Sequence, residues 1–254
     1  MAELRRLLID PLRINKSSLN NNIIDLTGQE SHYLARVLRL RYGDHINIVD
    51  GVGHLWTADF IKEDLIKLHS DLSNPEVTES KKNPLICLAV VVPKQDFDDI
   101  LRMSTEIGID VLQPIISDRS VVRNFQSERV KRWDSIINEA VEQSEQLWKP
   151  KLKEIICFNE WIDIYRKSTL MALGTTRIDN AIPFESLLND IKDDLNQICI
   201  AIGPEGGWSN HEIFLAREKE CANVLLADTI LKNTTAAIVA TQIMSSWRRS
   251  LNSF

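Results

Sequence analysis

The sequence predicts an α/β protein of two domains, and three observations support this fold class. Residues 74–84 (NPEVTESKKNP) hold two prolines and four charged side chains, a composition typical of a linker. Before this segment short apolar stretches alternate with turns, and after it apolar strands alternate with amphipathic helices. The length of 254 residues suffices for two ordinary domains. We therefore predict a domain over 1–73, a linker over 74–84 and a second domain over 85–254.

The first predicted domain is small and rich in β-strands. Its short apolar stretches begin near residues 7, 22, 45, 54 and 65, and each is bounded by residues that form turns. Asp50-Gly51, followed by Gly53, separates INIV from LWTADF, which favours a β-hairpin. One helix is expected over 31–40. Together these patterns favour a small β-barrel.

The second predicted domain alternates strands with helices. Apolar side chains recur at spacings of three and four over 127–148, which indicates an amphipathic helix. Ser209-x-x-Glu212 is a capping box that opens another helix, and a last helix is expected over 235–249. This alternation implies a largely parallel sheet covered on both faces. The strand candidates are residues 85–92, 111–116, 153–157, 169–173, 197–202 and 223–226.

Composition excludes several classes of protein. Hydrophobic residues make up 44% and charged residues 26%, which excludes a disordered or fibrous chain. The longest apolar run, residues 85–92, is too short to cross a bilayer, and no apolar signal segment follows the N-terminus, so a cytoplasmic protein is expected. The four cysteines stand at least 22 residues apart and no histidine has metal-ligand spacing. We therefore expect neither a disulfide framework nor a metal site.

The charge is negative overall but unevenly distributed. A net charge of −6 argues against a protein that coats nucleic acid nonspecifically. Residues 31–42 nevertheless carry three arginines and no acid, and residues 119–133 carry five basic side chains against one acid. A local basic face on an acidic body fits a selective RNA partner, although charge runs are also common on ordinary solvated surfaces.

Three loops follow predicted strands where open α/β sheets bind ligands. Leu173-Gly174 ends one strand, Gly203 to Gly207 (GPEGG) ends the next, and residues 227–235 follow the last. Glycines let a ligand approach the backbone closely, and the helix after GPEGG favours negative charge at its start. A tight structural turn is the alternative interpretation. Kinases, ATPases and dehydrogenases are disfavoured, because the chain has neither a P-loop nor a G-x-G-x-x-G turn.

Several short motifs occur in a recognisable order along the whole chain. GPEGG is followed about 25 residues later by Ile230-Leu231-Lys232-x-x-Thr235-Ala236. Further matches are Arg5-Arg6, His32, Val37-Leu38-Arg39, Gly43-Asp44, Thr105 to Gly108, Pro114, Arg119-Ser120, Glu139-Ala140, Glu142 to Ser144 and Pro150. Each motif is weak alone, but the ordered set is specific. The chain resembles the RsmE family of SPOUT methyltransferases, which methylate uracil N3 in 16S ribosomal RNA.

The resemblance implies a fold, a reaction and partners. The expected fold is a small PUA-like RNA-binding β-barrel followed by a SPOUT α/β methyltransferase domain with a parallel sheet and a C-terminal trefoil knot. The expected reaction is transfer of a methyl group from S-adenosyl-L-methionine to N3 of one uridine, uridine 1498 in rRNA numbering. The expected partners are 16S rRNA or the small ribosomal subunit and a second copy of the chain, with no membrane and no metal.

The resemblance also implies roles for individual residues. Lys232 and Arg119 are candidates for stabilising the anion that uracil forms when N3 loses its proton. RNA contacts, to phosphates or to splayed bases, are expected from Arg5, Arg6, His32, Arg36, Arg39 and Arg123. The cofactor pocket is expected at Leu173, Gly174, Ile202, Gly203, Pro204, Glu205, Gly206, Leu226, Ile230, Leu231, Thr235 and Ala236.

Four positions depart from the family pattern, which usually has Lys at Met103, Arg at Gln146, Arg at Lys232 and Glu at Thr234. Lysine lacks the bidentate fork of arginine, so the changes at 232 and 234 either compensate each other or weaken catalysis. Two alternatives stay open. One is a SPOUT ribose 2′-O-methyltransferase, whose last motif fits poorly here. The other is a catalytically weakened rRNA-binding or assembly protein of the same fold.

Overall fold

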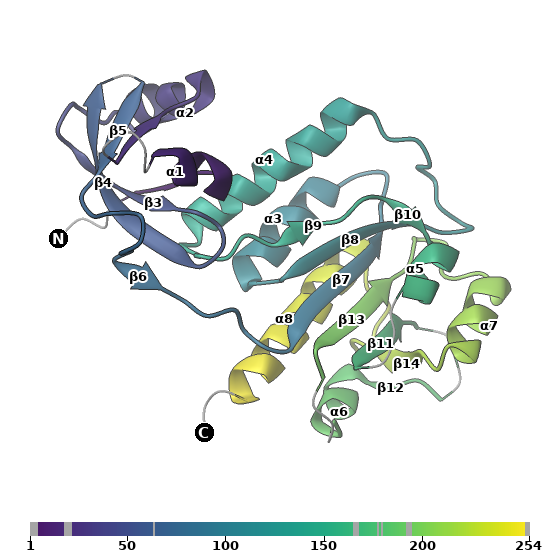
Figure 1. Cartoon of the computed structure of the whole chain (residues 1–254). Coiled ribbons are helices and arrows are strands. Elements are labelled where there is room, and N and C mark those ends of the chain that lie inside the picture. The colour runs from purple at the N-terminus through teal and green to yellow at the C-terminus, as the bar shows by residue number, and fades with distance from the viewer. Residues whose placement is uncertain are drawn as a thin grey trace. The chain divides into compact units, whose positions relative to one another are not determined.

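The computed structural model describes residues 5–17, 22–62, 64–164, 168–176, 178, 180–191 and 195–251. The chain divides into two compact units (Figure 1). The first comprises Met1–Lys81 with Asn138–Lys149, and the second comprises Lys82–Ile137 with Pro150–Phe254. The units differ from the predicted domains in that residues 138–149 belong to the first unit. Within the described residues, no helix is long and apolar enough to span a membrane.

The first unit is built on a six-stranded sheet of order β1-β3-β4-β5-β2, with β6 beside β4. β1 runs parallel to β3, and the other pairs are antiparallel. The expected hairpin is present, since β3 and β4 pair across Asp50-Gly51. The strands are β1 (Arg6–Leu8), β2 (Ile23–Asp25), β3 (His45–Val49), β4 (His54–Lys62), β5 (Leu65–Leu68) and β6 (Val77–Thr78).

The helix expected over 31–40 begins earlier and ends earlier. Helix α2 (Gly28–His32) starts after Thr27, whose side chain accepts a hydrogen bond from the Glu30 amide while the Glu30 carboxylate accepts one from the Thr27 amide. It continues as the π-helical turn η1 (Tyr33–Val37), and Arg39 then adopts a left-handed conformation with φ of 56°. The predicted range was wrong because the capping box at Thr27 starts the helix earlier and the left-handed backbone at Arg39 ends it. A short helix α1 (Pro11–Ser17) precedes β2.

Part of the predicted linker is ordered structure of the first unit. Strand β6 pairs with β4, and the Glu76 carboxylate accepts hydrogen bonds from both the amide and the hydroxyl of Thr57. The helix expected over 127–148 also ends earlier, because α4 (Ser127–Gln143) stops before Glu145, which has a φ of 59°. The indole of Trp148 donates to the carbonyl of Glu79 at 2.9 Å. Residues 76–79, in the first half of the predicted linker, thus belong to the first unit, whereas residues 82–84 belong to the second.

The second unit contains an eight-stranded parallel sheet of order β10-β8-β7-β13-β11-β14-β12, with β9 beside β8. All six predicted strands are present, although 153–157 is reduced to a two-residue strand and 223–226 shifts by one residue. The strands are β7 (Leu85–Val91), β8 (Val111–Ile116), β9 (Lys151–Leu152), β10 (Ile156–Cys157), β11 (Thr169–Gly174), β12 (Ile182–Pro183), β13 (Gln197–Ile202) and β14 (Ala222–Leu225).

Helices cover both faces of this sheet, as the alternation predicted (Figure 1). α5 and α7 pack together, and α5 also contacts β8, whereas α8 packs on α3, α6, β7 and β13. Along β7, Cys87, Ala89 and Val91 join the core beneath α5, and the intervening residues are equally buried. The helices are α3 (Phe97–Ile107), α4, α5 (Phe158–Ile164), α6 (Phe184–Asn189), α7 (Asn210–Glu218) and α8 (Asn233–Leu251).

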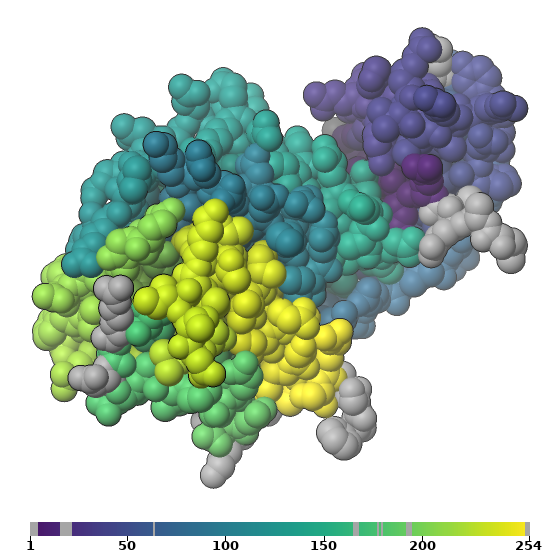
Figure 2. Space-filling view, turned by 180° about the vertical axis from the view of Figure 1, so that it is seen from behind, coloured from purple at the N-terminus to yellow at the C-terminus, as the bar shows by residue number. Residues whose placement is uncertain are grey.

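A buried ion pair fixes the C-terminal helix. Figure 2 shows α8 (yellow) along one face of the second unit. The Arg248 guanidinium near its end is paired with the Asp110 carboxylate and donates to the Gly108 carbonyl at 2.9 Å. The Asp110 carboxylate also accepts from the Ile86 amide at 2.8 Å. Both side chains are almost completely buried, so each charge depends on the other.

Candidate functional site

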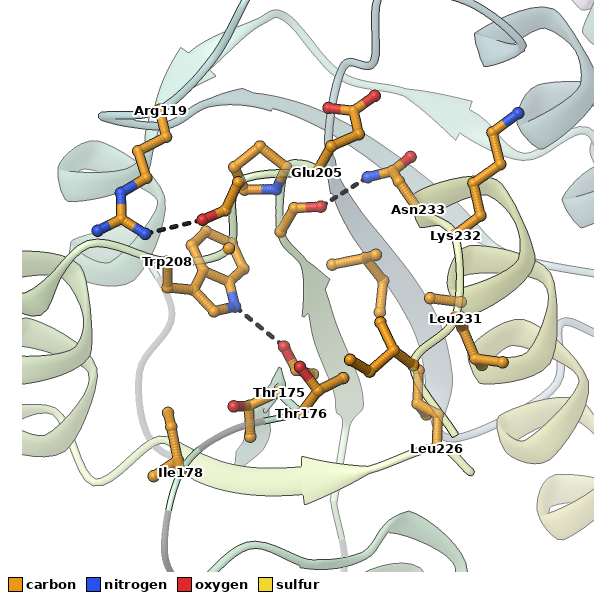
Figure 3. Close-up of a pocket in the computed structure, with 18 of the residues that line it drawn as sticks. Arg119, Thr175, Thr176, Ile178, Glu205, Trp208, Leu226, Leu231, Lys232 and Asn233 are labelled. Carbon is orange, nitrogen blue, oxygen red and sulfur yellow. Dashed lines mark hydrogen bonds between the residues drawn. The ribbon is translucent and has the colours of Figure 1, made fainter. Parts of the chain in front are cut away.

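A cavity of about 430 Å³ opens where β11, β13 and β14 end in the second unit (Figure 3). The carboxyl ends of parallel strands are the usual ligand position in open α/β sheets. Three loops supply most of its walls: residues 175, 176 and 178 after β11, 203–208 after β13, and 226–232 after β14. Arg119, the last residues of two strands and three helical residues complete the lining, which is Arg119, Gly174, Thr175, Thr176, Ile178, Ile202, Gly203, Pro204, Glu205, Gly206, Gly207, Trp208, Ile213, Leu226, Ala227, Thr229, Ile230, Leu231, Lys232, Asn233 and Ala236.

The GPEGG loop is held by its own turn and by the helix that follows. The Gly207 amide donates to the Pro204 carbonyl at 2.8 Å, and Gly207 has a φ of +69°, which favours glycine. The predicted capping box is present: the Ser209 hydroxyl accepts from the Glu212 amide, and the Glu212 carboxylate accepts from the Ser209 amide at 2.8 Å. The loop is therefore a fixed wall of the cavity.

Trp208 connects two of the three loops. Its indole nitrogen donates to the Gly174 carbonyl at 2.9 Å, and its ring packs directly on Gly203. A Cβ atom at position 203 would lie 2.9 Å from that ring, closer than such contacts allow. Phe158 of α5 supports the indole from a centroid distance of 5.0 Å. Position 203 therefore requires glycine because of the tryptophan rather than because of its own dihedral angles.

Asn233, the first residue of α8, ties the third loop to the second. Its side-chain amide donates to the Gly203 carbonyl at 2.7 Å and to the Val91 carbonyl at 3.4 Å. The side-chain oxygen is buried and has no hydrogen-bond partner among the described residues.

Arg119 comes from the loop after β8 and reaches the GPEGG loop. Its guanidinium donates to the Gly206 carbonyl at 2.7 Å. The loop that carries it is anchored by Glu212, a fully buried carboxylate that accepts from the Asp118 amide at 3.0 Å. The Ser209 hydroxyl donates to the Asp118 carboxylate at 2.5 Å. The capping box of α7 thus also positions Arg119.

Lys232 lies across the cavity mouth from Arg119, with the carboxylate of Glu205 between them (Figure 3). The Lys232 ammonium forms an ion pair with Asp96, and this hydrogen bond raises the pKa of Lys232 above its ordinary value. Asp96 precedes α3 in a left-handed conformation, with φ of 64°. Position 234 is threonine, and Asp96 supplies the carboxylate that pairs with Lys232. One end of the cavity is therefore strongly charged.

The structure brings together most of the residues predicted for the cofactor. All of them line the cavity except Leu173, whose side chain is buried in the core beneath α5, and Thr235, which is exposed on α8. Lys232 and Arg119 also line it. Gly207, Ala227, Thr229 and Asn233 lie in loops that the sequence indicated as ligand positions without naming them individually, whereas the sequence did not indicate Thr175, Thr176, Ile178, Trp208 and Ile213. Their places beside the predicted motifs were the only available signal.

The residues predicted to contact RNA differ in how exposed their side chains are and in whether they are already paired within the protein. Arg5, His32, Arg36 and Arg39 are exposed in the first unit. The Arg6 side chain is only 15% exposed, and its guanidinium donates to the Glu145 carboxylate at 3.0 Å. In the second unit, the Arg123 guanidinium donates to the Asp118 carbonyl at 2.5 Å and remains exposed.

Comparisons with known proteins agree with this architecture. The family described as RNA methyltransferase PUA domain matches residues 26–72, and the family described as RNA methyltransferase domain matches residues 80–245. Ribosomal RNA small subunit methyltransferase E of Synechocystis sp. is 34% identical over 92% of this chain and 75% of its own length. The enzyme of that name from Rickettsia conorii is 30% identical over 89% of this chain and 91% of its own.

A solved structure is similar throughout. Ribosomal RNA small subunit methyltransferase E from Neisseria gonorrhoeae, bound to S-adenosyl methionine, superposes with a TM-score of 0.80 at 26% identity. The match covers 96% of this chain and 98% of that one. A PUA-like domain followed by an α/β domain with a parallel sheet confirms the predicted fold class. The chain belongs to the ribosomal RNA small subunit methyltransferase E family.

Proposed function

We propose that the protein transfers a methyl group from S-adenosyl-L-methionine to N3 of one uridine in 16S rRNA, with the small ribosomal subunit as substrate. The observation that carries this proposal is the cavity formed by the three loops after β11, β13 and β14 in a chain of this family. Because the chain belongs to this family, a ribose 2′-O-methyltransferase is the weaker of the two functions.

The residues of the cavity fit S-adenosyl-L-methionine. Its volume of about 430 Å³ lies within the range of small-molecule sites. Ile202, Leu226 and Leu231 offer apolar surface for an adenine ring. When bound, S-adenosyl-L-methionine supplies a methyl group activated by a positively charged sulfur.

The charged end of the cavity suits the uracil. N3 carries a proton at neutral pH, so a group must accept that proton and others must stabilise the negative charge that remains. Lys232 and Arg119 supply positive charge beside the uracil oxygens, and the Glu205 carboxylate between them accepts the N3 proton. Asp96 keeps Lys232 protonated and in place, which replaces the arginine and glutamate that the family usually has at 232 and 234.

RNA binding is assigned to exposed basic side chains. Arg5, His32, Arg36 and Arg39 contact the RNA from the first unit, and Arg123 contacts it from the second. Arg6 is left out because its guanidinium is already paired with Glu145. We keep the predicted role of each part of the chain. Residues 1–73, with residues 138–149 added, bind RNA, and the rest of 85–254 transfers the methyl group. A homodimer, a C-terminal trefoil knot and a cytoplasmic location follow from the family resemblance.

The test is methyl transfer from labelled S-adenosyl-L-methionine to small subunits that lack the modification. Lys232→Ala and Glu205→Gln should each lower kcat by about 10²-fold or more while leaving S-adenosyl-L-methionine affinity within about threefold. Raising the pH should partly restore turnover of Glu205→Gln, because hydroxide then removes the N3 proton. Normal turnover and an unchanged pH profile in both variants would contradict these roles. If the parent protein methylates the subunit and neither variant lowers turnover, the proposed reaction still holds and only the roles of Lys232 and Glu205 are wrong.

A further inference from the structure

Two histidines and an aspartate of the first unit converge on one point. His45 begins β3, Asp59 lies in β4, and His69 directly follows β5. His45 Nδ1 lies 2.7 Å and His69 Nε2 lies 2.6 Å from the same oxygen, Oδ1 of Asp59. The two imidazole rings stand nearly perpendicular, with centroids 5.2 Å apart. In the part of the chain that the structure describes, this is the one group of three such side chains with ligand atoms within 4.8 Å of each other.

The sheet itself places the three side chains on one face. Ile46, Ala58, Phe60 and Leu68 are buried in the core, so their neighbours in sequence point outward. His45 is paired directly with Asp59 in the β3–β4 ladder. The His69 amide donates to the Thr57 carbonyl at 2.9 Å, which extends the β4–β5 pairing by one residue. His69 therefore lies diagonally across from Asp59, within reach of its carboxylate.

The donor set is suited to a metal ion. Two imidazole nitrogens and a carboxylate oxygen are ligands typical of Zn²⁺ and related divalent ions, with water completing the coordination. The side chains of His45, Asp59 and His69 are 56%, 37% and 39% exposed, so an ion can enter without unfolding. Around Zn²⁺ with bonds of about 2.0–2.1 Å the ligand atoms stand about 3.3 Å apart. A small rotation of the exposed carboxylate provides that separation.

We propose that His45, Asp59 and His69 form a binding site for a divalent transition-metal ion such as Zn²⁺. The bound ion joins β3, β4 and the residue after β5, and so stabilises the first unit. No short sequence motif indicates this site, because Asp59 is 14 residues from His45 and 10 from His69. Only the register of three antiparallel strands brings them together.

The test is calorimetric titration of the full-length protein with ZnCl₂, after removal of any affinity tag and in a Cys157→Ser background. Cys157 is an exposed thiol and would otherwise compete for the ion. We expect one ion per chain. Loss of an outer-shell partner already weakens metal binding tenfold or more, so His45→Gln and His69→Gln should each weaken Zn²⁺ binding by at least about tenfold. His54→Gln is the matched control, because His54 is paired with Asp50 at 2.6 Å but has no second histidine.

A second measurement separates metal binding from a merely structural role. Circular dichroism and melting curves in EDTA establish that each variant is folded. Saturating Zn²⁺ should then raise the melting temperature of the parent and of His54→Gln but not of His45→Gln or His69→Gln. X-ray absorption at the zinc edge should show two imidazole ligands in the parent. The proposal is overturned if the parent binds no Zn²⁺, or if folded His45→Gln and His69→Gln bind it as tightly as the control.

Discussion

Replacing Gly203 by alanine tests how the cavity is built. The added Cβ would lie 2.9–3.2 Å from three atoms of the Trp208 ring, so the indole must move. Overpacking of this kind costs about 1–3 kcal/mol of folding free energy. Movement of the indole also breaks its hydrogen bond to the Gly174 carbonyl, which contributes about 1 kcal/mol. Because the indole lines the cavity, its displacement should weaken S-adenosyl-L-methionine binding by about tenfold or more.

The matched control is Gly206→Ala in the same loop. Its Cβ would lie 3.6 and 3.7 Å from atoms of the Arg119 side chain, an ordinary contact distance. We expect stability within about 0.5 kcal/mol of the parent and little change in affinity. Urea unfolding measures the stability difference, and calorimetric titration with S-adenosyl-L-methionine measures affinity. If Gly203→Ala behaved like Gly206→Ala in both assays, the packing of Trp208 on Gly203 would not be what shapes this site.

Two further predictions concern buried charges. Burial raises the pKa of Glu142 from 4.5 to about 7 although its carboxylate accepts a hydrogen bond from the Leu8 amide. The folded state therefore holds a proton that the unfolded state has lost, and stability should fall by up to about 3 kcal/mol as pH rises from 4.5 to 7. Glu142→Gln should flatten this slope in urea titrations across that range; an unchanged slope would contradict the assignment. Arg248→Met leaves the Asp110 carboxylate buried and unpaired, so unfolding experiments should show a loss of about 3–5 kcal/mol, and a loss below about 1 kcal/mol would show that the pair is dispensable.

Local patterns predicted the features that depend on local sequence. The parallel strands, the GPEGG turn and the capping box at Ser209 follow from residues close together in the chain, and the structure has all three. Contacts between distant residues could not be predicted in this way. The pairing of Lys232 with Asp96 joins positions 136 residues apart, and the bond from Trp208 to Gly174 spans 34.

The predicted ends of elements were less accurate, for the same reason. The apolar spacing that indicates α4 continues past Gln143, but the chain turns at Glu145 and Trp148 then packs in the first unit. Strand β6 in the predicted linker carries too few apolar residues to be recognised and is held by pairing with β4. The trefoil knot stays a prediction from the family resemblance, because no local pattern encodes how the chain threads.

The most direct test of the proposed function identifies the methylated nucleoside. Purified protein is incubated with methyl-labelled S-adenosyl-L-methionine and small subunits that lack the modification, and the digested rRNA is analysed by mass spectrometry. We expect label in 3-methyluridine, and Gly203→Ala should reduce it. Label on a ribose would contradict the proposed base position and favour a 2′-O-methyltransferase. Absence of label, with cofactor and subunits both bound, would show a protein that has kept the fold and lost the reaction.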